Sequence, residues 1–151
     1  MIKPKVTDIK IVGFYSGKVI FGAGLLMLLP AFVSLLSHEW DILLGFITGF
    51  FLTLSIGLLL QAFCRVNAEL RWLHGLVITA FSWLLAVVIL PVPFYLSGQF
   101  GSYLDAMFDV MSGLTTTGLY LIQDLDHASN GINMWRHLLS YAGGQGIIVI
   151  A

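Results

Sequence analysis

A run of hydroxyl side chains closed by a glycine is the segment of this sequence best suited to chemistry. A potassium ion that sheds its water needs several oxygen ligands, and consecutive backbone carbonyls of an extended segment, helped by a threonine hydroxyl, can replace the hydration shell. The glycine gives the backbone the freedom that lets neighbouring carbonyls point the same way. The residue types therefore predict an ion-selectivity filter at Thr115, Thr116, Thr117, Gly118 and Leu119.

Taken alone, Thr-Thr-Thr-Gly favours a polar turn after a surface helix, but the residues around it favour a pore loop. Residues 103–114 are apolar at the helical spacing i, i+3, i+4, i+7, and a capping box at Ser102 and Asp105 predicts a helix start there. A helix of about eleven residues is only about 16 Å long, half a bilayer, so it must turn back or lie on the surface. If it ends at Gly113, its negative dipole end stabilises a cation in the cavity.

Acidic residues flank this segment on both sides, at Asp105, Asp109, Asp124 and Asp126. Their charge would concentrate cations near the loop, which predicts a cation-attracting vestibule. Acids in an exposed loop also serve solubility, and that alternative stays open for the acids taken alone. The run from Asp124 to His127 offers carboxylates and one imidazole, but such groups in an exposed turn are usually just solvated, so no structural metal is predicted.

The elements that must position the loop are transmembrane helices. With 58% hydrophobic and only 10% charged residues, the chain lies outside the usual composition of a soluble domain. The uncharged runs 19–37, 42–64 and about 73–90 are each long enough to cross about 30 Å of hydrocarbon, and a fourth apolar segment starts near Trp135. The first run could instead be a signal peptide, but it is long for one and no small-residue cleavage site follows before His38.

Basic residues predict the orientation of these spans. Six of the seven lie before the first span or between the second and the third: Lys3, Lys5, Lys10, Lys18, Arg65 and Arg71. Cytoplasmic segments carry an excess of Lys and Arg, so the N-terminus is expected in the cytoplasm. There is no basic face for nucleic acid, and the single cysteine, Cys64, is expected to be a reduced structural thiol.

The sequence predicts neither an enzyme nor a cofactor in this chain. It contains no nucleophile–base pair, phosphate-binding loop or dinucleotide fingerprint, and its spans hold no intramembrane acids from which a catalytic set could be built.

Two blocks of residues resemble the Trk/Ktr/HKT superfamily of potassium transporters, most closely the bacterial Trk type. The first block is Asp105-Ala106-Met107-Phe108 with the run from Ser112 to Gly118, which looks like the pore helix and filter of the family's first repeat. The second runs from Trp135 to Tyr141 and from Gly143 to Val149, and looks like the start of its inner pore helix. Two extra helices before the first outer pore helix are also similar to the Trk type.

The resemblance implies one chain of four covalently joined repeats, each with an outer helix, a pore helix with filter, and an inner helix. This chain would supply one quarter of the filter and looks like an N-terminal fragment of a longer protein. Serine in place of the first-repeat glycine goes with sodium transport in the plant branch, so Gly118 favours potassium. Arg136 would be a structural anchor rather than an ion ligand. A cytosolic nucleotide-binding regulatory subunit and a homodimer of the full-length protein are implied by the family only.

The expected fold is an all-α membrane protein: two N-terminal transmembrane helices, then one outer helix, a re-entrant pore helix with its filter loop, and the start of an inner helix. Residues 1–70 would hold the cytoplasmic segment and the first two helices, and residues 71–151 the first pore-forming repeat. The expected function is potassium uptake across the bacterial cytoplasmic (inner) membrane, in contact with lipid. The alternative is a non-conducting membrane scaffold or regulatory protein, in which the short helix lies on the outer surface.

Overall fold

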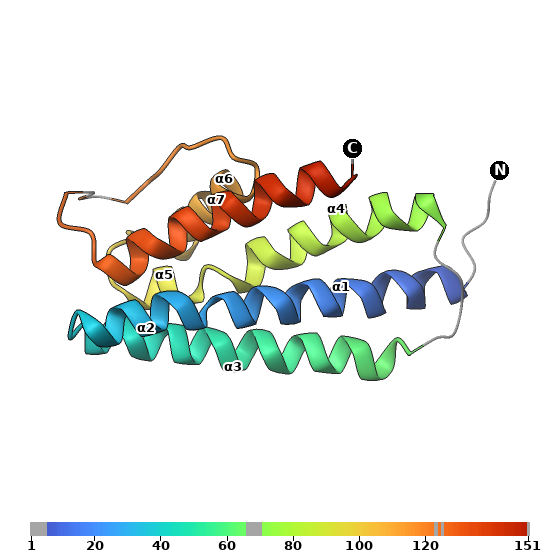
Figure 1. The fold of residues 1–151 in the computed structure, drawn as a ribbon, viewed down its shortest axis with the longest axis horizontal. Coiled ribbons are helices and arrows are strands. Elements are labelled where there is room, and N and C mark those ends of the chain that lie inside the picture. Colours follow the sequence, from blue (N-terminus) through green and yellow to red (C-terminus); the bar gives the residue numbers. More distant parts are fainter. Residues whose placement is uncertain (1–5, 66–70, 123, 125, 151) are drawn as a thin grey trace.

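The computed structural model describes residues 6–65, 71–122, 124 and 126–150, and this part of the chain is built from helices without any strand. The helices in chain order are α1 (Val6–Leu26), α2 (Leu28–Leu36), α3 (Trp40–Phe63), α4 (Trp72–Ile89), α5 (Val92–Leu96), α6 (Tyr103–Leu114) and α7 (Asn130–Ile150) (Figure 1). Three stretches are long and apolar enough to cross a membrane, namely Val6–Leu36, Trp40–Phe63 and Trp72–Leu96. The predicted all-α membrane fold is confirmed, while the division between residues 70 and 71 stays a prediction.

The first helix begins at Val6, well before the start of the uncharged run at residue 19. Its first half carries charges, so hydropathy alone does not mark it as part of the span. That half is helical because it has a packing partner: Gly13, Ser16 and Gly17 are buried there, and a side-chain carbon placed on Gly13 would lie 2.5 Å from the Cys64 sulfur at the end of α3. The thiol is therefore part of this packing, as expected for a structural cysteine.

Glycines bring the backbones of α1 and α3 together. A side-chain carbon on Gly17 would lie 2.9 Å from the Gly57 carbonyl oxygen, and one on Gly57 would lie 2.9 Å from the Gly17 carbonyl oxygen. In lipid, where apolar side chains gain little from leaving the solvent, such close backbone approach is what holds helices together. The α1–α3 pair is therefore a tightly packed hairpin.

Prolines interrupt two of the long helical stretches. Pro30 lies early in α2, has no N–H to donate and would place its ring against the Leu26 carbonyl, so α1 ends at Leu26 and α2 follows after Met27. Pro91 and Pro93 separate α5 from α4 in the same way. The second break directs the chain across the first half of α3, where a carbon on Gly49 would lie 2.9 Å from the Pro93 side chain.

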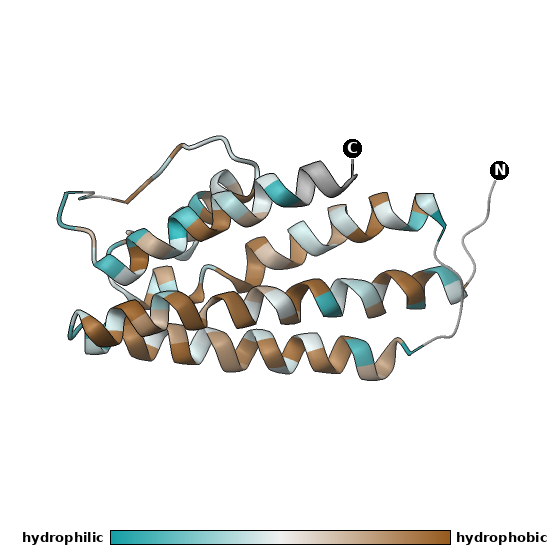
Figure 2. Ribbon diagram, viewed as in Figure 1, coloured by the Kyte–Doolittle hydropathy of each residue, from teal (hydrophilic) through white to brown (hydrophobic). Residues whose placement is uncertain are grey.

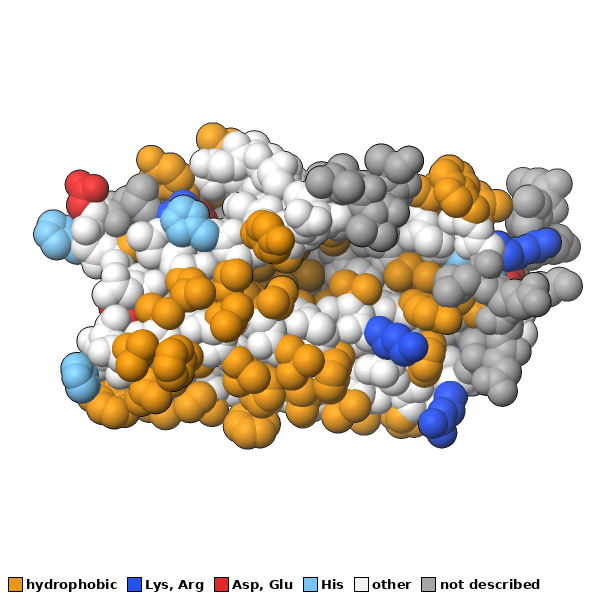
Figure 3. Space-filling model, viewed as in Figure 1, with side chains coloured by type: hydrophobic (Ala, Val, Ile, Leu, Met, Phe, Trp, Pro, Cys, Tyr) orange, Lys and Arg blue, Asp and Glu red, His pale blue; other side chains and the backbone are white. Residues whose placement is uncertain are grey.

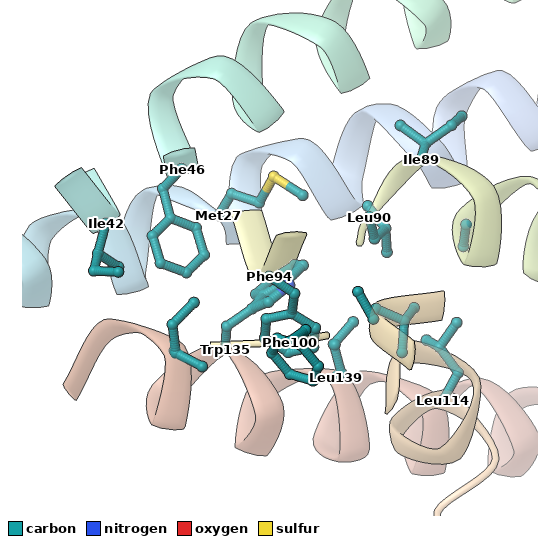
Figure 4. Packing of buried hydrophobic residues seen from close by; sticks show 14 of the residues in the cluster. Met27, Ile42, Phe46, Ile89, Leu90, Phe94, Phe100, Leu114, Trp135 and Leu139 are labelled. Atoms are coloured by element: carbon teal, nitrogen blue, oxygen red, sulfur yellow. The ribbon is translucent and has the colours of Figure 1, made fainter. Parts of the chain in front are cut away.

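A core of buried side chains joins these helices to α6 and α7. Phe46, Phe94, Trp135 and Met27 are fully buried, and Phe94 stacks on Phe100 at a ring separation of 4.9 Å (Figure 4). Many large apolar side chains of α1 to α4 remain exposed on the outer surface, and Figure 3 shows them along the bundle on the face that it draws. Figure 2 shows that hydrophobic residues predominate along these helices. Such a continuous apolar surface suits a lipid environment.

The two ends of the bundle differ. The start of α1, the end of α3 and the start of α4 lie together at one end, and the α2–α3 turn and the start of α7 lie at the other (Figure 1). In the face drawn in Figure 3, most of the Lys and Arg surface lies toward the first end, and most of the His and acidic surface lies at the second. The orientation of the bundle in the membrane stays a prediction.

Candidate functional site

The short helix expected before the Thr-Thr-Thr-Gly run is α6, which runs from Tyr103 to Leu114. It begins there because the Ser102 hydroxyl accepts a hydrogen bond of 3.2 Å from the Asp105 backbone N–H. Asp105 is half-buried in the first turn, where a carboxylate is favoured by the positive end of the helix dipole. At twelve residues, α6 is about 18 Å long, too short to span a bilayer.

The chain reverses direction directly after α6. The Thr117 N–H donates to the Ser112 carbonyl and the Thr116 N–H donates to the Gly113 carbonyl, both at 2.9 Å, which is the hydrogen-bond pattern of a Schellman motif. Thr116 occupies the left-handed position of that motif, with φ of 56°. A β-branched residue is rarely found there, because its side chain crowds the backbone, at a cost of about 1–2 kcal/mol. The helix ends at Leu114 rather than at Gly113.

The residues predicted to form the filter follow this reversal. The Thr115 hydroxyl donates to the Met111 carbonyl at 2.9 Å and lies 2.8 Å from the Thr117 hydroxyl. Gly118 has φ of 79°, so it uses the left-handed freedom expected of it. Residues 116–119 are exposed and run as irregular backbone toward the end of the bundle where α7 starts (Figure 1).

Asp109 and Arg136 tie α6 and α7 together. The Arg136 Nε donates to one Asp109 carboxylate oxygen at 3.0 Å, and the Leu121 N–H donates to the other at 3.0 Å. The side chains are 2% and 18% exposed for Asp109 and Arg136 respectively, so the pair is shielded from solvent. The Arg136 guanidinium also lies over the Tyr120 ring, 5.0 Å from its centre. One ion pair therefore anchors both α6 and the backbone that follows the Thr-Gly loop.

The four acids of the predicted vestibule fall into different environments. Asp109 is buried and neutralised by Arg136, so its charge does not face solvent. Asp124 and Asp126 are exposed, and Asp124 accepts hydrogen bonds from the ring and the backbone N–H of His127. The hydrogen bond from the His127 ring is the main cause that holds the pKa of the Asp124 carboxyl below its usual value. The vestibule stays a prediction. Of its four acids, Asp105, Asp124 and Asp126 are accessible to solvent.

Glycines of α6 and α7 allow the two helices to touch. A side-chain carbon on Gly143 would overlap the Leu114 carbonyl group, and one on Gly113 would lie 3.0 Å from the Leu139 side chain. The last carbonyls of α6 therefore lie directly against the α7 backbone. This contact fixes the position along α7 at which the chain reverses.

A residue far away in the sequence caps α7. The Glu39 carboxylate, in the turn between α2 and α3, accepts the Asn130 N–H at 2.8 Å and the Gly131 N–H at 3.1 Å. The preceding residue, His38, adopts φ of 59°, a left-handed conformation that turns the chain into α3. The α2–α3 turn thus holds the start of the helix that carries Arg136.

Sequence reasoning missed the partners of these residues. Arg136 was expected to be a structural anchor, and the ion pair supports that role, but Asp109 was not identified as its partner. A signal was present: a lone charge in an apolar segment requires a counter-charge. Nothing local marked Glu39 as the cap of a helix 91 residues away. Among the described residues, no three His, Cys, Asp or Glu side chains gather as a metal site would require.

Comparison with known proteins gives a consistent result. Residues 43–151 match the TrkH family, described as cation transport protein. An uncharacterized cation transporter of Methanocaldococcus jannaschii is 35% identical over 135 residues, which is 89% of this chain and 28% of that protein. The Trk system potassium uptake protein TrkG of Escherichia coli is 28% identical over 146 residues (96% of this chain, 30% of TrkG).

A third relative is the Trk system potassium uptake protein TrkH of Halomonas elongata, 32% identical over 139 residues, covering 89% of this chain and 28% of that protein. The chain thus spans less than a third of the length of these curated relatives. No solved structure matches the chain.

Proposed function

The chain belongs to the TrkH family of cation transport proteins, and we propose that it supplies one quarter of a potassium-selectivity filter, at Thr115, Thr116, Thr117, Gly118 and Leu119. The family and the relatives are transporters rather than enzymes, and the chain is a multi-pass membrane protein. The observation that carries the proposal is the half-length helix α6 followed by a backbone reversal whose residues 116–119 remain exposed. Irregular backbone at membrane depth is tolerated only where protein or a water-filled cavity satisfies its polar groups.

The geometry of the loop suits a cation. The Thr115 and Thr117 hydroxyls bond to each other, and Thr115 bonds to α6. These bonds hold the hydroxyls in place and leave the backbone carbonyls of the exposed segment to replace the hydration shell of potassium, the transported ion. In an extended strand, successive carbonyls point to opposite sides. The left-handed backbone at Thr116 and Gly118 breaks this alternation. The C-terminal dipole of α6 adds negative potential at the reversal.

The charges around the loop have separate roles in this proposal. The buried Asp109 is matched by Arg136, so this pair holds the loop without competing for the ion. Asp105, Asp124 and Asp126 are the acids that raise the local concentration of cations at the outer mouth. Gly118, rather than a residue with a side chain, keeps the space next to the carbonyls open.

The rest of the proposal rests on the family. The remaining three quarters of the filter would come from further repeats of a longer protein in a bacterial cytoplasmic membrane, with the basic end of the bundle and the N-terminus in the cytoplasm. A cytosolic nucleotide-binding regulatory subunit would act from that side, and the full-length protein would form a homodimer. No cofactor is proposed for this chain.

The test is Gly118→Ser in the full-length protein, expressed in cells that need an uptake system to grow on low potassium. Gly98→Ser is the matched control, because Gly98 also has a left-handed φ, of 68°, and open space around it, but lies outside the loop. We expect Gly118→Ser to lower the ratio of potassium to sodium uptake and Gly98→Ser to leave it unchanged. If both variants behave alike and rescue growth as the parent does, the filter assignment is wrong and the non-conducting scaffold is favoured.

A further inference from the structure

A small cavity lies behind the proposed filter, between the loop and α7. Its volume is about 30 Å³, and its polar lining comes from Asp109 and Ser112 of α6 and from Arg136 and Ser140 of α7, with Gly118 and Leu119 on the loop side. It is therefore bounded by all three elements that define the position of the loop.

One of the residues that line this cavity, Ser112, has an unsatisfied hydroxyl. The Ser112 hydroxyl is buried, with the residue 5% exposed, and has no hydrogen-bond partner among the described residues. Ser112 already uses its backbone carbonyl to accept the Thr117 N–H at the reversal, so its side chain is the group left over. Buried hydroxyls in folded proteins nearly always have a partner, because leaving one without a partner is costly.

The size and the charge of the cavity select its occupant. A site holds a water molecule when its free volume is at least about 10–15 Å³ and two to four polar partners are present. The cavity meets the first condition and is too small for an organic ligand. A cation is disfavoured, because the Arg136 guanidinium lines the same space and the Asp109 charge is already matched. The occupant that fits is therefore a small neutral molecule that both donates and accepts hydrogen bonds.

We propose that an ordered water molecule occupies this cavity and joins the Ser112 hydroxyl to the Asp109–Arg136 pair and the Ser140 hydroxyl. Each Asp109 oxygen accepts one hydrogen bond in the structure and has a further lone pair. The Ser140 hydroxyl donates to the Arg136 carbonyl at 3.3 Å and can still accept. The water supports Gly118 and Leu119 from behind, which links α6, the loop and α7 through a single molecule.

The consequence for transport rests on the proposed function. Removing one partner of the water leaves the ion pair intact but weakens the support of the loop. A neutral hydrogen bond contributes about 0.5–1.5 kcal/mol, so we expect Ser112→Ala to lower the potassium-to-sodium uptake ratio roughly two- to tenfold. The matched control is Ser82→Ala: the Ser82 hydroxyl of α4 is also buried without a partner among the described residues, but it does not line this cavity.

The experiment compares maps of the full-length parent, Ser112→Ala and Ser82→Ala in lipid nanodiscs, at a resolution that shows ordered water. We expect density within hydrogen-bond distance of the Ser112 hydroxyl in the parent and in Ser82→Ala, and its loss in Ser112→Ala. An empty cavity beside well-ordered Ser112 and Arg136 side chains overturns the proposal. Uptake ratios are measured on the same three proteins, and equal ratios for the two alanine variants overturn the supporting role of the water. If the full-length parent does not discriminate potassium from sodium, the proposed filter is wrong. The density beside Ser112 tests the water independently of that result.

Discussion

The α1–α3 hairpin and the α6–α7 unit solve the same packing problem in different ways. In the hairpin, Gly17 and Gly57 let two backbones touch, and the contact is made of carbonyls and methylene groups. In the α6–α7 unit, Gly143 plays a similar part, but the backbone after α6 is irregular and needs specific partners, which Asp109 and Arg136 provide. Close packing is enough to hold a regular helix in lipid, whereas a loop also needs its polar groups anchored.

The largest expected effect comes from breaking the anchor. Arg136→Ala leaves the Asp109 carboxylate, 2% exposed, without its counter-charge, and removing one partner of a buried pair costs about 3–5 kcal/mol. We expect a lower thermal unfolding temperature of the purified full-length protein and loss of uptake. The double variant Asp109→Asn with Arg136→Gln should recover part of the stability, because no uncompensated charge is left. A single variant as stable as the parent would show that the pair does not anchor the loop.

The next effect tests the glycine of the same unit. Gly143→Ala places a carbon where the Leu114 carbonyl lies, so the end of α6 must move away from α7. Overpacking of this kind costs about 1–3 kcal/mol, and the displaced loop should also transport less selectively. The control is the neighbouring Gly144→Ala, whose new carbon would lie 3.6 Å from the nearest Thr116 atom, an ordinary contact. Equal unfolding temperatures for the two variants would contradict the close approach.

The same substitution in the hairpin separates stability from selectivity. Gly57→Ala puts a carbon 2.9 Å from the Gly17 carbonyl oxygen, and we expect destabilisation of about 1–3 kcal/mol with an unchanged potassium-to-sodium ratio in the protein that remains folded. Gly22→Ala in α1 meets nothing within 4 Å and should be neutral or slightly stabilising. A change of selectivity in Gly57→Ala would mean that the two regions are not independent.

The smallest expected effect concerns the contact between the two regions. Glu39→Gln removes the charge that caps α7 through the Asn130 and Gly131 N–H groups, at a cost of about 1 kcal/mol. Asp41→Asn, which removes the charge of an exposed acid in the first turn of α3, is the control. Hydrogen exchange at the start of α7 should rise in Glu39→Gln only. Faster exchange in both variants would attribute the effect to the general charge of this end.

Much of the fold could be predicted from local patterns. The uncharged runs located α3 and α4 to within two residues, and the apolar spacing with the Ser102 cap gave the bounds of α6. Hydropathy placed the start of the first helix too late, because residues 6–18 carry charges and become helical by packing on α3. The start of α7 was likewise placed late, at Trp135 instead of Asn130, since its polar first turn is stabilised by Glu39.

The sequence alone determined that this chain lies in a membrane and that a half-length helix precedes a Thr-Gly loop, and it predicts that the loop binds a cation. It could do so because hydropathy, helical periodicity and capping are read from residues a few positions apart. Only the tertiary structure decided that Asp109 pairs with Arg136 instead of facing solvent. It also decided that Thr116 adopts the left-handed backbone of the reversal and that Glu39 caps α7. Those contacts join residues 27 to 92 positions apart or depend on a backbone conformation that threonine rarely adopts, so no local pattern encodes them.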